Sequence, residues 1–158
     1  MKIASSRLLD YYTETRPSPL HGLGLFAKRD IPERTIWWKA KRSNVMLLNR
    51  SQFFTFQASH INETMNNLMN LAQIYGYYSG RLDSIIICLD NARFVNHSFD
   101  PNSGAPPSGN PLSSMTLRKI EEGEEITEDY SCYDLCAWSQ ITCSELFLVD
   151  RQPRAVAQ

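Results

Sequence analysis

The chain has 158 residues, enough for one domain with one hydrophobic core, and 42% of them are hydrophobic. Its 16 basic and 17 acidic residues give a net charge of −1, which predicts neither direct nucleic-acid binding nor membrane association. The start of the chain has no apolar run suited to a signal peptide, and the aliphatic run 85–87 is too short to span a bilayer. The 4 cysteines are therefore expected to be free thiols in a reducing, intracellular compartment.

The first third of the chain is predicted to form strands. Prolines and glycines between residues 17 and 32 separate short apolar runs, of which residues 24–27 and 35–38 are the clearest. Such runs between turn-forming residues are typical of a β-rich arrangement.

The middle of the chain predicts one helix and then a buried strand. Apolar side chains recur at helical spacing on one face, namely at Ile61, Met65, Leu68, Ala72 and Tyr75. Ser59 or Asn62 could supply the N-cap, and Gly76 could end the helix. Residues 84–89 are apolar and rich in β-branched side chains, which favours a buried strand.

The last third predicts further strands. Residues 100–111 are nearly all turn formers and indicate a surface loop, whose length makes it a candidate functional segment. Residues 114–120 tend to alternate, residues 121–125 form a turn, and residues 126–130 are extended. The tail from residue 131 is expected to hold one short helix packed on the core, with Pro153 onward frayed. The order of elements predicts a mostly β, α+β domain with one central helical insertion, and the absence of βαβ alternation disfavours a Rossmann fold.

Three stretches stand out for their chemistry: residues 21–27 (HGLGLFA), 93–102 (RFVNHSFDPN) and 123–130 (GEEITEDY). The first has only two glycines and no helical pattern after it, so alone it indicates a tight turn more readily than a dinucleotide site. Together, their order and spacing resemble the SET-domain family of lysine methyltransferases, over about residues 7–133.

The resemblance implies a fold and a domain organisation. SET domains are β-clip-like folds of small twisted sheets with knot-like C-terminal threading, in which the Asn-His-Ser segment and the Asp-Tyr strand lie together. Nothing in the periodicity predicts such threading. The implied organisation is a single SET domain over residues 1–158, with an inserted helical segment at about 51–80 and a C-terminal lid segment at about 131–150.

The resemblance also implies a reaction. A methyl group passes from S-adenosylmethionine to the side-chain amine of a lysine in a histone or another basic protein, which leaves S-adenosylhomocysteine as the product. Tyr130 matches the family's active-site tyrosine, and Asn96 matches the asparagine that fixes the amino-acid end of the cofactor. The implied cofactor-binding residues are Gly22, Leu23, Gly24, Arg93, Phe94, Asn96, His97 and Tyr130.

The chemistry fits these residue types. Methyl transfer to an amine is an in-line displacement that needs a neutral amine, and neutralising a lysine of pKa about 10.4 near pH 7 costs roughly 4–5 kcal/mol. A narrow apolar channel and the sulfonium charge both lower that pKa. Tyr130 is therefore expected to orient the amine and shape the electrostatics, not to abstract a proton. The amide of Asn96 offers donors and acceptors to the cofactor's carboxylate and ammonium, and Gly22 and Gly24 are expected to let the backbone approach it.

Histidine and tryptophan residues near these motifs are expected to have supporting roles. The backbone of His97 is expected to contact the adenine, while its ring supports the local structure. His21 and His60 show no ligand spacing with it, so we reject a histidine metal site. Trp37 and Trp38 either lie on a strand that runs beside the cofactor, as the resemblance implies, or pack in the core. Arg93 is expected to form structural ion pairs or hydrogen bonds, with Asp90 as one candidate partner, and Asp129 to act in the same way.

The sequence departs from the family in two places. Many relatives hold zinc with cysteines after the tyrosine and directly after Asn-His-Ser, but Phe99 follows Ser98, and the tail cysteines have a different spacing. No metal is predicted, and an aromatic lid of Tyr133, Leu135 and Trp138 is expected to close the lysine channel instead. Residues 103–105 also lack the aromatic residue that limits the number of methyl groups in relatives, so this number is left open.

Two functions remain open from the sequence. An active protein-lysine methyltransferase is favoured because both Tyr130 and Asn96 are present, and a catalytically inactive SET-fold interaction module is the alternative. The expected partner is a lysine-bearing, histone-like protein or peptide, with no direct nucleic acid and no membrane, and a homodimer is left open. The acidic segment 121–129 either attracts such a peptide or is a solvated hairpin. The expected location is the cytoplasm, or a host nucleus for a viral protein or secreted effector.

Overall fold

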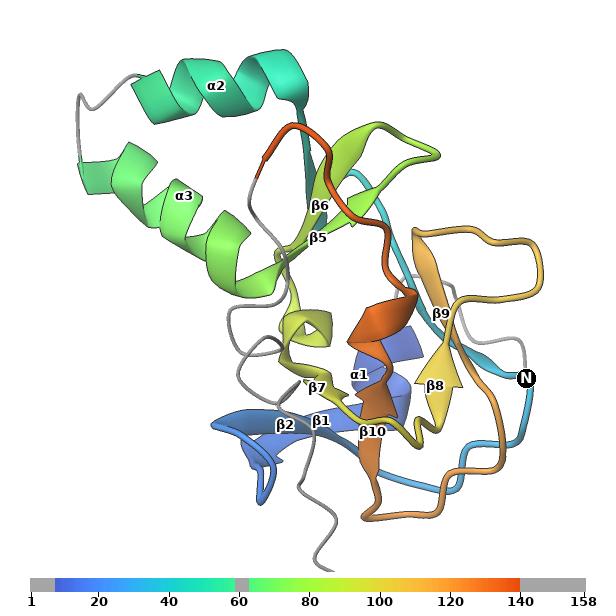
Figure 1. Ribbon diagram of the computed structural model, residues 1–158. Helices are drawn as coiled ribbons and strands as arrows, with labels where there is room; N and C mark the ends of the chain where they lie inside the picture. The colour runs from blue at the N-terminus through green and yellow to red at the C-terminus, as the bar shows by residue number, and fades with distance from the viewer. Residues whose placement is uncertain (1–7, 59–62, 140–158) are drawn as a thin grey trace, which may run out of the picture.

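The computed structural model describes residues 8–58 and 63–139 as three small β-sheets with short helices between them (Figure 1). The first sheet has the order β1-β2-β10-β7, with bounds Thr13–Pro17, Leu23–Ala27, Glu125–Glu128 and Asn96–His97. The second has the order β3-β9-β8, with bounds Ile36–Lys39, Ser113–Thr116 and Ser103–Gly104. The third has the order β4-β6-β5, with bounds Val45–Asn49, Ser84–Cys88 and Gly76–Ser79. The mostly β, α+β fold predicted from the sequence is confirmed.

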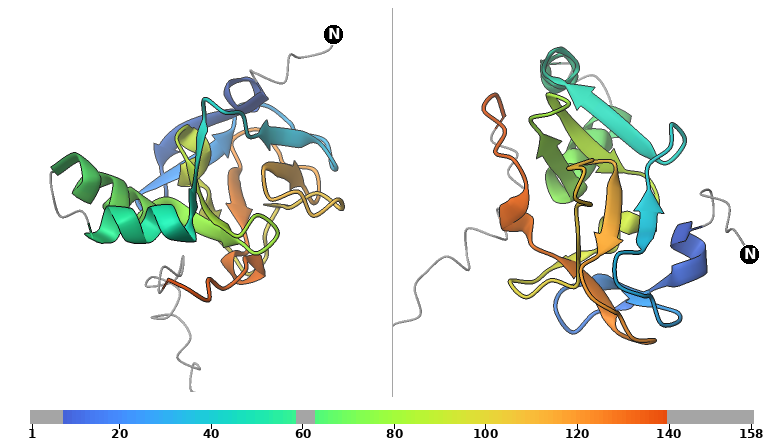
Figure 2. Two further views of the ribbon diagram at one scale, coloured as in Figure 1. Left: turned by 90° about the horizontal axis from the view of Figure 1, so that it is seen from above. Right: turned by 90° about the vertical axis from the view of Figure 1, so that its right-hand side faces the viewer.

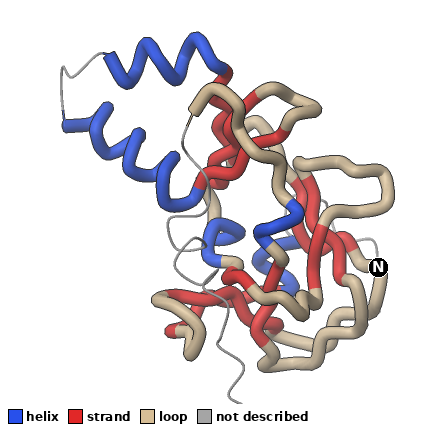
Figure 3. Tube along the Cα trace, in the orientation of Figure 1, coloured by secondary structure: helices blue, strands red, loops and turns tan. Residues whose placement is uncertain are grey.

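The helices are few. Their bounds are Leu8–Tyr12 for α1, Arg50–Ala58 for α2 and Glu63–Tyr75 for α3, with 3₁₀ turns η2 at Asn91–Phe94 and η3 at Tyr130–Cys132. Helices α2 and α3 lie at one end of the molecule beside β4, β5 and β6, away from the sheet of β1, β2 and β10 (Figures 1 and 2). The rest of the chain alternates between short strands and loops (Figure 3). None of the described helices is both long enough and apolar enough to cross a membrane.

The predicted central helix is confirmed at α3, but a second helix, α2, precedes it. Ala72 on the predicted face is fully buried, and Gly76 begins β5 directly after α3. A Cβ on Gly76 would lie 2.4 Å from the Ala72 carbonyl oxygen, so only glycine fits this close turn. Helix α2 begins with reciprocal hydrogen bonds between Asn49 and Gln52, each backbone N–H donating to the other side chain.

Two clusters of buried side chains form the core. The larger joins the first two sheets and contains Leu25, Ala27, Ile31, Trp37, Trp38, Cys88, Ala92, Val95, Ile120 and Ile126. The smaller lies under the two helices and contains Leu48, Phe53, Ala72, Ile85 and Ile87. All five residues of β6 are buried, as the apolar run predicts. Burial raises the pKa of the Cys88 thiol far above its ordinary value, so this free cysteine is a packing residue.

The prediction of a surface loop over residues 100–111 is wrong at the start of that range, where two polar residues are buried. Asn102 and Ser103 are 2% and 1% exposed, and Ser103 begins β8. The Asn102 amide donates to the carbonyl oxygen of Glu125 at 2.7 Å, and its Oδ1 accepts from the Thr127 N–H at 2.9 Å. Asn102 therefore satisfies backbone groups of β10 from outside its sheet, which the turn-forming composition could not reveal.

Replacing Asn102 by alanine is expected to destabilise the fold. It leaves the buried Thr127 N–H and the Glu125 carbonyl without these partners, and each such loss costs about 1–3 kcal/mol. We expect a loss of about 3 kcal/mol in the free energy of unfolding and a fall in Tm of roughly 9 °C. Asn91, which is exposed, provides the matched control, and calorimetry showing equal Tm values for both alanine variants would contradict the role of Asn102.

Candidate functional site

A cleft of about 940 Å³ lies where the first and third sheets meet η2 and η3. Most of the residues singled out in the sequence line it: Gly22, Leu23, Arg93, Phe94, Asn96, His97, Tyr130 and Tyr133. Trp37 and Trp38 also line it while belonging to the core. Gly24 and Trp138 are not among the lining residues.

The strand β10 brings the three motifs together. It pairs antiparallel with β2, where Ile126 faces Leu25, and parallel with β7, where Thr127 faces Asn96 and Glu128 faces His97. The Gly-x-Gly turn, the Asn-His segment and the Glu-Asp-Tyr segment are therefore neighbours in one sheet. The juxtaposition of the Asn-His segment and the Asp-Tyr strand implied by the family resemblance is confirmed.

Asn96 ties the turn before β2 to β10. Its Nδ2 lies 3.1 Å from the His21 carbonyl oxygen, 3.2 Å from that of Leu23 and 2.7 Å from Glu125 Oε1. Ser18 Oγ lies 2.8 Å from the same Glu125 carboxylate. The Asn96 amide therefore fixes the shape of the glycine turn, in which Gly22 has a φ of +48° with open space where its side chain would be.

Gly24 packs against the side chain of Glu125. It does not line the cleft, but its Cα lies against the carboxylate that Asn96 and Ser18 bind. A Cβ there would be 2.2 Å from Glu125 Oε1 and 2.9 Å from the Ser18 Cβ. Glycine is required so that Glu125 can approach the turn.

Replacing Gly24 by alanine is expected to displace Glu125 and loosen the turn without unfolding the domain, because the carboxylate is the far end of a flexible side chain. We expect ligand affinity at the cleft to fall about 10-fold, equivalent to the loss of one hydrogen bond of roughly 1.4 kcal/mol. Calorimetric titration with S-adenosylmethionine measures this change. Gly109 also has open space around it, but its φ of +62° would strain any other residue, so Gly109→Ala is not a clean control. The exchange of alanine for glycine at exposed position 137, Ala137→Gly, serves instead. Equal affinity in the Gly24 and Ala137 variants would contradict the packing role of Gly24.

Tyr130 lies in the cleft, and hydrogen bonds fix both its backbone and its hydroxyl. Its backbone N–H donates to His97 Nδ1 at 3.1 Å, and its hydroxyl donates to the Val95 carbonyl oxygen. The ring stacks on that of Tyr133 at 5.6 Å, and Tyr133 stacks on Tyr77 at 5.0 Å. The predicted supporting role of the His97 ring is consistent with its bond to the Tyr130 backbone.

Asp129 stabilises the turn that carries Tyr130. It accepts a hydrogen bond from the Ser131 N–H at 2.8 Å, and its Oδ1 lies 3.8 Å from His97 Nδ1. Burial opposes ionisation of this carboxyl, but the hydrogen bonds from Ser131 outweigh it and keep the pKa of Asp129 below its usual value. The structural role predicted for Asp129 is confirmed.

A buried chain of hydrogen bonds lies behind the tyrosines. Trp37 Nε1 donates to Ser103 Oγ at 2.7 Å, Ser103 Oγ donates to Glu128 Oε1 at 3.0 Å, and the Tyr133 hydroxyl donates to Glu128 Oε2 at 2.7 Å. Burial, with the nearby charge of Glu128, raises the pKa of Tyr133 well above its usual value. Tyr133 is therefore a protonated donor at neutral pH. The sequence places Glu128 only within the acidic segment 121–129, but it lies two residues after buried Ile126 and so on the same buried face of the strand.

Trp138 lies apart from Tyr130 and Tyr133. Its ring packs against Phe53 at 5.6 Å and Tyr78 at 5.7 Å, and its Nε1 donates to Asp83 at 2.9 Å. It covers the helical end of the core, and Leu135 is 81% exposed. Of the three residues proposed for an aromatic lid, Tyr133 alone lines the cleft. Residues 131–139 of the expected tail include the end of the 3₁₀ turn η3, and no helix longer than this turn is present in that described part. The rest of the lid segment, from residue 140, and the expected frayed end lie outside the described residues.

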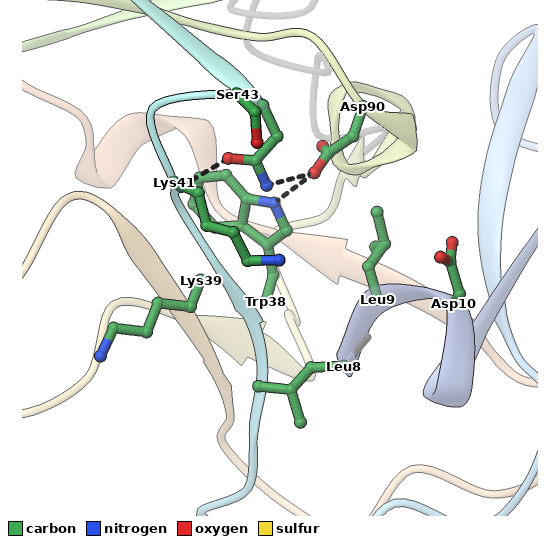
Figure 4. Close-up of a pocket in the computed structure, with 9 residues that line it drawn as sticks. Leu8, Leu9, Asp10, Trp38, Lys39, Lys41, Ser43 and Asp90 are labelled. Carbon is green, nitrogen blue, oxygen red and sulfur yellow. Dashed lines mark hydrogen bonds between the residues drawn. The ribbon is translucent and has the colours of Figure 1, made fainter. Parts of the chain in front are cut away.

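Arg93 makes structural hydrogen bonds, as expected, and its backbone N–H donates to the Asp90 carbonyl oxygen at 3.4 Å, but no ion pair joins these two described side chains. Arg93 donates to the Leu89 carbonyl oxygen at 3.3 Å, and its guanidinium lies 4.7 Å from the centre of the Phe94 ring. The Asp90 carboxylate accepts from Trp38 Nε1, Asn44 Nδ2 and the Ala92 N–H. Figure 4 shows Trp38 and Asp90 beside a smaller cavity of about 240 Å³. Three neutral donors already satisfy the Asp90 carboxylate. Within residues 8–58 and 63–139, no group of three or more His, Cys, Asp or Glu side chains could hold a metal ion.

Comparison with known proteins defines the class. The SET domain family model matches residues 22–131, more than two thirds of the chain. The chain is 44% identical over 54 residues to the histone-lysine N-methyltransferase set9 of Schizosaccharomyces pombe, a match covering 34% of this chain and 12% of that protein. The chain belongs to the SET domain family.

Solved structures share the fold at low sequence identity. A Plasmodium falciparum protein proposed to be a histone methyltransferase matches with a TM-score of 0.50 and 19% identity, over 75% of this chain and 92% of that one. Polycomb Repressive Complex 2 of Chaetomium thermophilum, in an autoinhibited conformation bound to S-adenosylmethionine, matches with a TM-score of 0.52 and 19% identity. That match covers 76% of this chain and 15% of the other. These likenesses establish the fold.

Proposed function

We propose that the protein is an S-adenosylmethionine-dependent methyltransferase that acts on a lysine side chain of a histone or another basic protein, inside the cell. The observation that carries the proposal is the convergence of the glycine turn, Asn96 and Tyr130 on one cleft. Two similar proteins are described as histone methyltransferases, which supports this substrate class.

The residues of the cleft fit the cofactor. Its volume of about 940 Å³ is within the usual size of small-molecule sites, and Gly22 leaves open space beside the turn. Asn96 with the turn of Gly22 and Leu23 would hold the amino-acid end, and Arg93, Phe94 and His97 would border the remainder. When bound, the cofactor supplies an electrophilic methyl group on a sulfonium.

The tyrosines of the cleft would prepare the amine. The stacked rings of Tyr77, Tyr133 and Tyr130 exclude water from one wall. A less polar environment disfavours the ammonium form and lowers the pKa of a lysine placed there. Tyr130, as the catalytic residue, would orient the neutral amine with its hydroxyl, which the Val95 carbonyl oxygen holds in place.

The hairpin residues 121–125 of the acidic segment 121–129 contribute less to substrate attraction than their sequence predicts. Arg118 lies 2.5 Å from Glu124, and Lys119 lies 2.6 Å from Asp30 and 3.9 Å from Glu121. These ion pairs neutralise part of the acidic charge, which favours the solvated-hairpin interpretation. Recognition of a basic substrate is then assigned to the cleft.

The direct test uses purified protein with labelled S-adenosylmethionine and core histones, followed by mass spectrometry of the labelled peptides. We expect a methyl group on a lysine. Cofactor binding by calorimetry without label on histones or on a cell lysate would favour the inactive interaction module. No cofactor binding would contradict both functions.

A further inference from the structure

We propose that the carboxylate of Glu128 binds the positively charged amine of the substrate side chain, an unmethylated or partly methylated lysine, within the cleft. This inference rests on the proposed function, because it assigns the amine-binding group of the same site. Glu128 would then be a specificity-determining residue that selects for a cation and sets the pH at which the amine reacts.

Glu128 is a buried acid without a cationic partner among residues 8–58 and 63–139. It is 7% exposed, lines the cleft and takes part in none of the ion pairs of that part of the chain. Within the described part of the chain, its two oxygens accept only from the neutral hydroxyls of Ser103 and Tyr133. A buried carboxylate without an opposite charge is unfavourable, so a ligand that brings a cation would be stabilised there.

Hydroxyl groups donate hydrogen bonds to both oxygens of Glu128. The Trp37 indole donates to Ser103 Oγ, which directs the Ser103 proton toward Glu128. The phenol of Tyr133 donates to the second oxygen. Both carboxylate oxygens are thus acceptors, with lone pairs left for an ammonium.

The wall beside Glu128 is aromatic. Tyr77, Tyr133 and Tyr130 form a continuous stack with ring centres 5.0 and 5.6 Å apart, and the middle ring carries the hydroxyl bound to Glu128. The neighbouring rings cover both faces of Tyr133, so the attraction for a cation comes from the carboxylate and not from that ring. A carboxylate beside a weakly polar wall favours an amine over an uncharged side chain of equal length.

The cofactor also carries cationic groups, and the hydrogen bonds separate the two sources. Asn96, assigned to the cofactor's amino-acid end, bonds to Glu125. Glu128 bonds instead to Tyr133, the middle ring of the tyrosine stack where the substrate amine is assigned. The amine assigned to Glu128 is accordingly that of the substrate.

A Glu128→Gln variant tests the assignment through activity. Glutamine keeps the shape, can accept from Ser103 and can donate to the Tyr133 oxygen, but it removes the charge. For core histones we expect KM to rise about 10-fold, with affinity for S-adenosylmethionine within twofold of the wild type.

An opposite charge at close range raises an amine pKa by about 1–3 units. The rate needs the neutral amine, so the ascending limb of the pH–rate profile should move down by about 1 pH unit in the variant. Glu122→Gln, at an exposed glutamate, is the charge-matched control.

A second measurement does not depend on turnover. The indole N–H of Trp37 reports on Glu128 through Ser103, and its NMR signal is assigned with a Trp37→Phe variant. In protein loaded with S-adenosylhomocysteine, protonated n-pentylamine should shift this signal, whereas uncharged 1-pentanol should not. The shift should disappear in Glu128→Gln.

The activity measurement and the NMR measurement give distinct outcomes. Normal KM and an unmoved pH profile in Glu128→Gln, or an equal response to amine and alcohol, would overturn the inference. A loss of cofactor affinity with unchanged KM would assign Glu128 to the cofactor and also overturn it. If no histone or lysate protein is methylated, the proposed reaction fails, but a Glu128-dependent response to pentylamine still supports the amine site.

Discussion

Tyr130→Phe is expected to lower the rate of methyl transfer about 100-fold while leaving the affinity for S-adenosylmethionine within threefold of the wild type. The hydroxyl is held by the Val95 carbonyl oxygen, and the ring is held by its stack on Tyr133 and its contact with His97. Phenylalanine keeps the ring contacts and removes only the hydroxyl dipole. Losing one preorganised polar group at a reacting centre typically costs about 10²–10³ in rate.

Single-turnover measurement with saturating cofactor and core histones isolates this effect from binding. Tyr11→Phe is the matched control, because Tyr11 packs against Tyr12 and the Arg29 guanidinium away from the cleft. The Tyr130 variant loses one hydrogen bond, so its stability should fall by only about 1 kcal/mol. Transfer at the wild-type rate would remove Tyr130 from the reaction.

The elements predicted from the sequence are those with a strong local signal. The face of α3 with Ala72 follows helical periodicity, and β6 is apolar throughout, so both were predictable. Helix α2 lies within the helical segment of about residues 51–80 that the family resemblance implies, but its phenylalanines form no clear helical stripe, so no periodic signal predicts it. Its start signal, the pairing of Asn49 with Gln52, becomes evident only once both backbone N–H groups are seen to be bonded.

The three motifs lie together beside one cleft, although they are far apart in the sequence. Sequence order could not show that one strand, β10, joins the glycine turn to the Asn-His segment, because pairing between distant segments leaves no periodic signal. The same limit explains Trp138, whose aromatic character fits a lid as well as a cover for α2. It also explains Asn102, which resembles a turn residue until its bonds to β10 are known.

Replacing Asn96 by aspartate is expected to weaken binding of S-adenosylmethionine about 30-fold or more, which corresponds to roughly 2 kcal/mol. The amide of Asn96 donates toward two carbonyl oxygens and the Glu125 carboxylate. A carboxylate at the same place would face three acceptors, one of them a like charge at 2.7 Å in the native geometry. The glycine turn should then separate from β10. Asn91→Asp makes the same chemical change at an exposed position.

A Glu125→Gln replacement combined with Asn96→Asp tests this explanation. The glutamine amide can donate to the new aspartate, which reverses the direction of the original hydrogen bond and removes the repulsion. Calorimetry on the wild type, both single variants and the double variant gives the coupling between the two positions. We expect the double variant to recover at least 10-fold of the lost affinity, equivalent to about 1.4 kcal/mol of coupling. If the double variant binds no better than Asn96→Asp, the amide acts on the ligand directly and not through the turn.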